Sequence, residues 1–316
     1  MNLPVPTQIQ NIPVEVLRQT VDNFSLSESS WRVLRFQWSK FERWGGHLGI
    51  DEGRVCDYLR HLANSGIKAS GLESARWAID QHHKRSGHAV PTGNRTRQHL
   101  KGIKRILVDQ SPGQVRIAQK QPLMISEIRK FYFDDSLSGV RDKTLLLVGF
   151  ATGMRRSELS RLRKEDVEQT EFGLRVSIWK SKTNQEGLKE TVDVMKATKG
   201  RYLDFCPAQA MQRLLEVTPG DYVFQSVRYA GDGMQTFTGK PLSGISIGKI
   251  VKQYAMQLGM DPADFGAHSL RAGCATYLLD HEVPPSAVQK QMRHKRFDTT
   301  QRYNRGETAR ALVGAY

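Results

Sequence analysis

The sequence is poor in cysteine and has no long apolar run. Its three cysteines, Cys56, Cys206 and Cys274, lie far apart in 316 residues, which fits neither a disulfide framework nor the ligand spacing of a zinc site. The longest apolar stretch, residues 144–151, is too short to cross a bilayer, and the N-terminus lacks a charged segment followed by an apolar one. We therefore expect a soluble, cytoplasmic protein with no membrane partner.

Acidic residues are outnumbered by basic ones. The chain has 47 Lys and Arg against 32 Asp and Glu, a formal net charge of +15, and the basic excess is present both before and after residue 120. Such an excess indicates a polyanionic partner, because Lys and Arg release counterions when they contact phosphates. Charge alone does not separate nucleic acid from an acidic membrane surface, but its even spread favours one long anion bound by both parts of the chain.

Apolar residues at helical spacing predict an all-helical bundle in the first 110 residues. The expected helices cover about 31–44, 52–63, 72–85 and 96–108. Ser25 with Glu28, and Ser70 with Glu73, form the S-x-x-E pattern of a capping box ahead of the first and third of these helices. Turn-forming residues then interrupt the pattern. The sequence therefore predicts a helical domain over 1–110, a linker over 111–121 and a second domain over 122–316.

The second domain mixes helical and strand patterns. Alternating residues predict strands at 174–180 and 190–195 around a loop at 182–187. Helices are expected at about 126–134, 142–152, 157–162, 208–217, 243–258, 269–279, 286–292 and 308–313. The predicted fold class is mainly α: an N-terminal helical bundle followed by an α+β domain, mostly helical with a small antiparallel sheet.

The sequence lacks an H-E-x-x-H motif, a Walker loop and a cluster of carboxylates that would hold magnesium. Phosphodiester chemistry without these needs fixed cations for the phosphate oxygens and a proton donor for the leaving oxygen. Arg155 and Arg271 are candidates, because planar guanidinium groups bind phosphate bidentately. His268 lies three positions before Arg271 and shares its helix face. Taken singly, each arginine is more often a surface or ion-paired residue than a phosphate ligand, and His268 is equally explained as a histidine at the start of a helix.

The joint pattern is more specific than any single residue. Thr-Gly-Met-Arg-x-Ser-Glu-Leu begins at residue 152, Ser-Lys-Thr at 181 and His-Ser-Leu-Arg at 268, and Tyr303 follows His294 by nine positions. In this order and spacing the chain resembles the tyrosine recombinase (phage integrase) family. The resemblance covers essentially the whole chain, because the first domain is similar in type to that family's SAM-like core-binding domain.

The resemblance implies a role for each motif residue. Tyr303 would attack the scissile phosphate and form a 3′-phosphotyrosyl link, while Arg155 and Arg271 would hold the non-bridging oxygens. Lys182 would protonate the leaving 5′ oxygen. The remaining catalytic groups act on protons and orientation: His268 would assist proton transfer from the phenol, His294 would hydrogen-bond the phosphate, and Glu158 would orient the cationic groups.

Some positions depart from the family pattern or compete for a role. Arg293 stands before His294, where the family usually has glycine. Lys180 competes with Lys182, and Arg156 competes with Arg155, which the Gly-Met-Arg register favours. Tyr277 and Tyr316 are rival phenols without the spacing from histidine.

The expected partner is double-stranded DNA carrying a specific site with inverted repeats, and no metal or other cofactor is expected. The predicted DNA contacts are Arg76, Lys84, Lys101, Lys104, Arg105 and Arg293, although a basic helix face is equally typical of a solvated surface. The resemblance implies a homotetramer assembled on DNA through the C-terminal helix, with possible accessory proteins and a nucleoid location.

The leading hypothesis is a site-specific DNA recombinase that exchanges strands sequentially through a Holliday junction. A relative with the same site is the enzymatic alternative, such as a topoisomerase IB-like enzyme or a telomere resolvase. A DNA-binding regulator that has lost catalysis is the alternative from another class.

Overall fold

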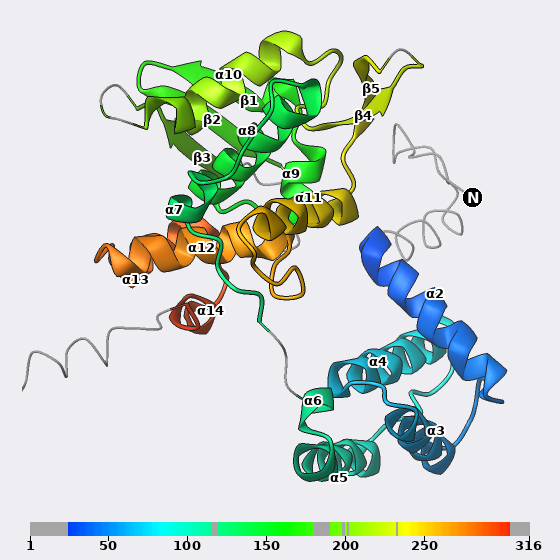
Figure 1. The fold of residues 1–316 in the computed structure, drawn as a ribbon. Helices are drawn as coiled ribbons and strands as arrows, with labels where there is room; N and C mark the ends of the chain where they lie inside the picture. Colours follow the sequence, from blue (N-terminus) through cyan, green and yellow to red (C-terminus); the bar gives the residue numbers. More distant parts are fainter. Residues whose placement is uncertain are drawn as a thin grey trace, which may run out of the picture. The chain divides into compact units, whose positions relative to one another are not determined.

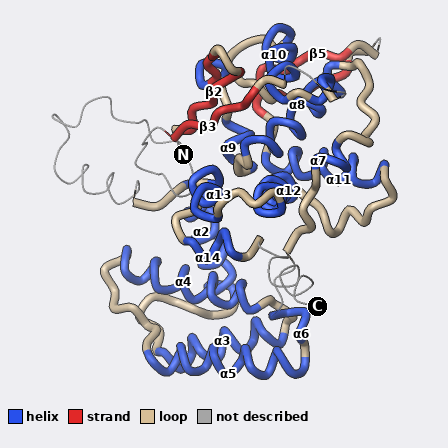
Figure 2. Tube along the Cα trace, turned by 90° about the vertical axis from the view of Figure 1, so that its left-hand side faces the viewer, coloured by secondary structure: helices blue, strands red, loops and turns tan. Residues whose placement is uncertain are grey.

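The computed structural model describes residues 25–115, 119–179, 190–197, 200, 202–231 and 233–303. The chain divides into two compact units, Met1–Ala118 and Gln119–Tyr316, and Figure 1 shows their elements. Helices make up most of both units, and the strands of the second form small antiparallel sheets (Figure 2). The predicted fold class is therefore confirmed.

Unit 1 is a helical bundle. Within residues 25–115 its helices are α2 Glu28–Arg43, α3 Glu52–Asn64, α4 Ala69–Arg85, α5 Asn94–Gln110 and the short α6 Pro112–Val115. One face of α2 is buried, and it carries Leu34, Trp38 and Phe41. Residues four and seven positions apart share a face of a helix. Trp38 and Phe41 pack against apolar residues of α3, α4 and α5 in a single core.

The caps of these helices differ from two sequence predictions. Ser27, not Ser25, is the N-cap of α2, and its hydroxyl accepts a hydrogen bond from the Ser30 amide at 3.2 Å. Helix α4 begins earlier than predicted, with Lys68 at its N-cap and no side-chain cap, so Ser70 lies inside the helix. The S-x-x-E pattern therefore identified the N-cap of neither helix, because it does not determine which residue adopts the extended N-cap backbone.

A carboxylate from another helix caps α5. Gly93, its N-cap, has no side chain, and Glu52 of α3 instead accepts hydrogen bonds from the Gly93 amide at 2.7 Å and the Thr96 amide at 2.8 Å. These bonds, with the Thr96 hydroxyl bond at 2.8 Å, hold the pKa of Glu52 below its usual value. Helix α5 then continues to Gln110, two residues beyond the predicted end at 108.

Helix α8, Leu137–Thr152, lies in the middle of unit 2. It contacts α7 Ile125–Ile128, α10 Pro207–Val217, α12 Ala267–Asp280 and strand β3, as Figure 1 shows. Most of its residues are buried, which explains why the sequence is apolar around the whole helix rather than along one stripe. This buried helix ends at Gly153, and the next residues carry the first part of the candidate site.

The main sheet is a three-stranded antiparallel meander of β1 Val167–Thr170, β2 Gly173–Ile178 and β3 Glu190–Met195. Ile178 pairs with Glu190 at one end of the ladder. The predicted strands correspond to β2 and β3. Strand β1 and the hairpin of β4 Gln225–Tyr229 and β5 Gln235–Pro241 were not predicted, because their short, partly exposed segments show little alternation.

The rest of unit 2 is helical. The predicted helix at 126–134 is only the one-turn α7, and α14 Phe297–Gln301 was not predicted. The remaining elements are α9 Arg156–Arg161, η2 Lys164–Asp166, η3 Leu203–Phe205, α11 Gly244–Gln257 and α13 Pro285–Met292. The predicted helix 308–313 lies outside the described residues. No helix in the described part of the chain has both the length and the apolar character needed to cross a bilayer.

Candidate active site

Arg155 is placed by the turn that ends α8. Gly153, the C-cap of α8, has φ 57°, a left-handed conformation that favours glycine, and Arg155 is the N-cap of α9 two residues later. The Arg155 guanidinium donates to Glu158 Oε1 at 2.6 Å and to the Arg293 carbonyl at 3.0 Å. Its side chain is 17% exposed, so it is held in place but still reachable from solvent.

Arg271 lies on α12 and is buried. Its guanidinium donates to the carbonyls of Gly153 and Met292, which are the ends of α8 and α13. Burial, together with the charges of Arg155 and Arg293, lowers the pKa of Arg271 to about 10. The group is still cationic at neutral pH. It is a fixed positive charge at the junction of three helices.

His268 and Tyr303 form the contact that joins the two ends of the motif set. His268 Nε2 and the Tyr303 hydroxyl are 3.0 Å apart, although 35 residues separate them in sequence. Partial burial and the charges of Arg271 and Arg155 lower the pKa of His268 below its usual value. A neutral imidazole is therefore favoured at neutral pH, and its nitrogen can accept the phenolic proton.

His294 also contacts Tyr303. Its ring stacks on the Tyr303 ring with centroids 5.9 Å apart and an interplanar angle of 8°. His294 Nδ1 is 2.9 Å from the Thr300 hydroxyl on α14. Burial and the charges of Arg271, Arg155, His268 and Arg293 lower the pKa of His294 to about 4. This histidine is therefore neutral at physiological pH.

Glu158 links the arginines of the site. Its side chain is fully buried, and Oε2 accepts hydrogen bonds from the Arg155 amide at 2.8 Å and from Arg293 Nη2 at 3.0 Å. Burial alone would raise the pKa of this carboxyl group. The charge of Arg293 and the bonds from Arg155 outweigh burial and hold the pKa below its usual value, so Glu158 is a permanent anion among cations.

Arg293 differs from its sequence-based prediction as a DNA contact. Its side chain is only 5% exposed and is bonded to Glu158 rather than free on the surface. A second donor of the same guanidinium reaches the Gln291 carbonyl at 3.0 Å. These contacts assign Arg293 to the internal network of the site in this structure.

Lys182 and its rival Lys180 lie outside the described residues. The flanking strands are described, however, and Glu190 at the start of β3 is near the arginine cluster: its Oε2 is 4.0 Å from Arg293 Nε. Glu190 pairs with Ile178 at this end of the ladder, and both lysines lie between these two residues in the sequence.

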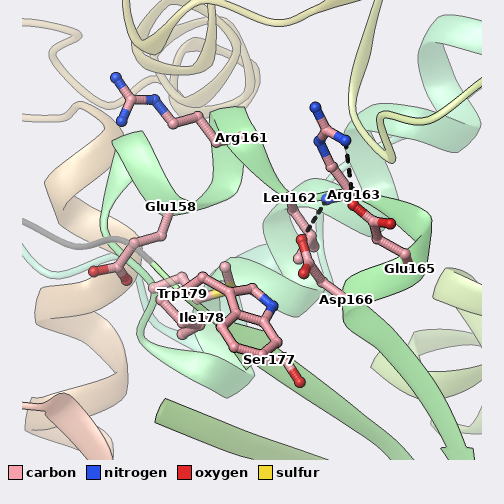
Figure 3. A pocket seen from close by; sticks show the side chains of 10 residues that line it. Glu158, Arg161, Leu162, Arg163, Glu165, Asp166, Ser177, Ile178 and Trp179 are labelled. Carbon is pink, nitrogen blue, oxygen red and sulfur yellow. Dashed lines mark hydrogen bonds and ion pairs between the residues drawn. The ribbon is translucent and has the colours of Figure 1, made fainter. Parts of the chain in front are cut away.

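A hollow of about 620 Å³ opens beside this cluster, between α9, η2 and β2. Glu158 lies at one side of it in Figure 3, and Ser177 of β2 and Trp179, which follows β2, are among the residues that line it. Arg163 is already bonded there, through its side chain to Glu165 and through its amide to Asp166. The described segments contain no group of three His, Cys, Asp or Glu side chains that could share a metal ion.

The structure brings together five of the six predicted catalytic residues and the predicted orienting glutamate. Arg155, His268, Arg271, His294 and Tyr303 meet at the ends of α8, α9, α12, α13 and α14. Tyr277 lies apart from this group, stacked on His281 at 3.9 Å, and Tyr316 is not among the described residues. Thr300 and Glu190 were missed because neither residue belongs to a local motif.

The predicted DNA contacts of unit 1 fall into two groups. Lys84, Lys101 and Arg105 are exposed. Arg76 and Lys104 are engaged with Glu73 at 3.2 and 2.7 Å, and Arg76 also pairs with Asp80. The second pair is therefore less available to a phosphate than the sequence suggested.

Comparison with known proteins gives a consistent result. A model of the phage integrase family matches residues 123–310. The chain is 26% identical over 290 residues to an integrase/recombinase XerD homologue of Selenomonas ruminantium, covering 88% of this chain and 82% of that protein. It is 27% identical over 262 residues to the tyrosine recombinase XerD of Xanthomonas axonopodis pv. citri (strain 306), covering 82% and 79%.

Two solved structures show the same fold. The Tn1549 transposon integrase in complex with transposon right end DNA has a TM-score of 0.63 and 15% identity, covering 94% of this chain and 96% of that one. The XerH site-specific recombinase bound to a palindromic difH substrate has a TM-score of 0.59 and 20% identity, covering 84% and 72%.

Proposed function

The chain belongs to the phage integrase family and is a tyrosine-type site-specific DNA recombinase, and we propose that Tyr303 is its nucleophile. The observation that carries this assignment is the 3.0 Å contact between the Tyr303 hydroxyl and His268 Nε2. Arg271 lies close enough for the charge of Tyr303 to influence its pKa. A phenol, a neutral base and fixed cations are thus gathered at one place.

The cleavage step follows from this arrangement. The Tyr303 oxygen bonds to phosphorus while its proton passes to His268, and the bond from phosphorus to the 5′ oxygen breaks. The product is a 3′-phosphotyrosyl link and a free 5′ hydroxyl. Attack by the 5′ hydroxyl of a partner strand reverses the step, so rejoining requires no external energy source.

Arg155 and Arg271 hold the non-bridging oxygens of the phosphate in this proposal. Main-chain carbonyls of Arg293, Gly153 and Met292 fix the two guanidinium groups. Because these donors are oriented before the substrate arrives, little reorganisation is needed as negative charge develops. His294, with Nδ1 bonded to Thr300, presents its other nitrogen as a further phosphate contact.

Lys182 is the proposed donor of the proton to the leaving 5′ oxygen. Support comes from the strands that flank it, because the β2–β3 ladder ends beside the arginine cluster at Glu190.

We also propose that the enzyme acts as a tetramer on two duplexes, by sequential strand exchange through a Holliday junction. The sites would carry inverted repeats, and the C-terminal helix expected at 308–313 would join the subunits. The formal charge of +15 is divided between the two units, which suits a protein that holds DNA with both units. The exposed Lys84, Lys101 and Arg105 are the unit 1 contacts that we propose.

Covalent trapping tests the nucleophile. Nicked duplexes selected for binding from a randomised pool would be incubated with the wild type, Tyr303→Phe and Tyr277→Phe, and adducts counted after denaturation. We expect adducts with the wild type and with Tyr277→Phe, whose phenol lies outside the site, and none with Tyr303→Phe. An adduct formed by Tyr303→Phe would refute the assignment.

A further inference from the structure

Arg293 occupies a backbone conformation that favours glycine. It is the C-cap of α13, with φ 53° and ψ 46°. Left-handed conformations are unfavourable for residues with a Cβ atom. The chain nevertheless carries a long cationic side chain there, and that side chain is turned inward with 5% exposure. An interior function for the guanidinium would explain why this strained position is not glycine.

One edge of the Arg293 guanidinium is hydrogen-bonded to Glu158, which also binds the proposed phosphate ligand Arg155. Its Nη2 donates to Glu158 Oε2 at 3.0 Å, and Glu158 Oε1 accepts from Arg155 at 2.6 Å. The carboxylate therefore bridges Arg293 to Arg155, and the backbone carbonyl of Arg293 receives a second bond from Arg155 at 3.0 Å. Any displacement of Arg293 is transmitted to Arg155 by two routes.

The other edge of the guanidinium faces Glu190. Arg293 Nε and Glu190 Oε2 are 4.0 Å apart, and both atoms are buried without a hydrogen-bond partner among the described residues. Buried polar atoms are rarely left unpaired, and these two belong to groups of opposite charge that lie 4.0 Å apart. An approach of about 1 Å would turn this separation into a charge-assisted hydrogen bond.

Glu190 is the first residue of β3 and closes the ladder opposite Ile178. The segment before it, residues 180–189, contains Lys182. Fixing Glu190 would therefore fix one end of the segment that carries the proposed proton donor. Arg293 lies between this end and the bridge to Arg155.

We propose that Arg293 is a positioning residue that couples the lysine segment to the phosphate-binding arginines. Closure of Glu190 onto Arg293 Nε sets the start of β3 against α9 and α13, while Nη2 keeps Glu158 and Arg155 in place. The inference deepens the proposed cleavage mechanism and rests on the role assigned there to Lys182.

Cleavage of two matched nicked duplexes tests the coupling. One duplex has the ordinary bridging 5′ oxygen, and the other has sulfur at that atom, which departs as a thiolate and does not need a proton. We expect Glu190→Gln and Arg293→Lys to slow cleavage of the oxygen duplex by about 10- to 100-fold, the range typical of residues that orient catalytic groups. Glu190→Gln should cleave the sulfur duplex at nearly the wild-type rate, as Lys182→Ala should, whereas Arg293→Lys, which also loses the bond from Nη2 to Glu158, should stay partly slowed on the sulfur duplex.

The double variant and a control sharpen the result. Because both substitutions break the same contact between Glu190 and Arg293, the double variant should cleave no more slowly than the slower single variant. Asp193→Asn is the control on the same strand, since Asp193 pairs with Arg175 at 2.8 Å on an exposed surface. It should cleave both duplexes at the wild-type rate.

Three outcomes would overturn the coupling: wild-type cleavage of the oxygen duplex by Glu190→Gln, equal slowing of both duplexes by Glu190→Gln, or multiplied effects in the double variant. A failure of the proposed function would be distinguishable from a failure of the coupling. If sulfur does not rescue Lys182→Ala, Lys182 is not the proton donor, and the inference falls with it. If sulfur rescues Lys182→Ala but not Glu190→Gln, only the coupling is wrong.

Discussion

Replacement of Glu158 by glutamine tests the buried charge network directly. The carboxylate has no exposed surface and accepts bonds from the Arg155 amide, the Arg155 guanidinium and the Arg293 guanidinium. Glutamine has nearly the same shape but one acceptor oxygen and a donor amide. In either orientation its NH₂ group meets an arginine N–H, and two partly or fully buried guanidinium groups lose their counter-charge.

The expected loss of unfolding free energy is large. Breaking a buried ion pair by removing one partner costs about 3–5 kcal/mol. Glutamine keeps one acceptor, so we expect about 3 kcal/mol for Glu158→Gln. Glu165→Gln is the matched control: Glu165 pairs with Arg163 at 3.2 Å, but the two side chains are 71% and 45% exposed. Exposed pairs of this kind contribute about 0–1 kcal/mol.

Urea titrations followed by far-ultraviolet circular dichroism would measure both variants at pH 7. The pH dependence adds a second check, because the pKa of Glu158 is lower in the folded chain than its usual 4.5. The stabilisation from its charge is fully present above that pH and is lost as the pH falls through the lowered folded value. Equal losses for the two variants, or a Glu158→Gln deficit that persists unchanged at pH 3, would refute the reasoning.

Three further outcomes are expected. Gly153→Ala should destabilise unit 2 by about 2 kcal/mol, because its φ is 57° and a Cβ there would lie 2.7 Å from Met292 Sδ. Gly66 has a similar φ of 79° but open space around it, so Gly66→Ala should cost only about 1 kcal/mol. Equal losses of unfolding free energy in urea titrations would contradict this steric explanation. The pKa of His294 is lowered to about 4, so its contribution to stability is complete above pH 6.5 and declines toward pH 4; an NMR titration that finds this ring protonating near 6.5 would disprove the burial argument. Thr300→Val removes the 2.9 Å partner of His294 Nδ1 and should slow adduct formation about tenfold, with unchanged DNA affinity in a filter-binding assay.

The local helix patterns were the most dependable part of the sequence. The stripe of Leu34, Trp38 and Phe41 predicted α2 because its periodicity reflects a single buried face. The caps were less predictable: the S-x-x-E pattern indicated Ser25, but in the folded chain Ser27 has the extended backbone at the N-cap. Strands β1, β4 and β5 were missed because their pairing depends on partners in space.

In the candidate site too, the sequence indicated local features, and the folded structure was needed for contacts between distant residues. Its motif residues were identified from their order and spacing in the sequence, because the reaction requires particular side chains at those positions. Their assembly was not visible, since the 3.0 Å contact of His268 with Tyr303 spans 35 residues. The burial of Arg293 was likewise not visible in the sequence. A basic residue beside a motif looks like a DNA contact until its inward direction is known.

Residue type and linear order were sufficient to indicate the family, the fold class and the chemical groups of the reaction, because covalent chemistry restricts which side chains can serve. Three-dimensional packing decided which groups titrate abnormally and which arginine is held by Glu158. It also placed Arg293 between Glu158 and Glu190. Burial, distance and the direction of a side chain arise only when remote segments pack together, and electrostatic interactions depend on all three.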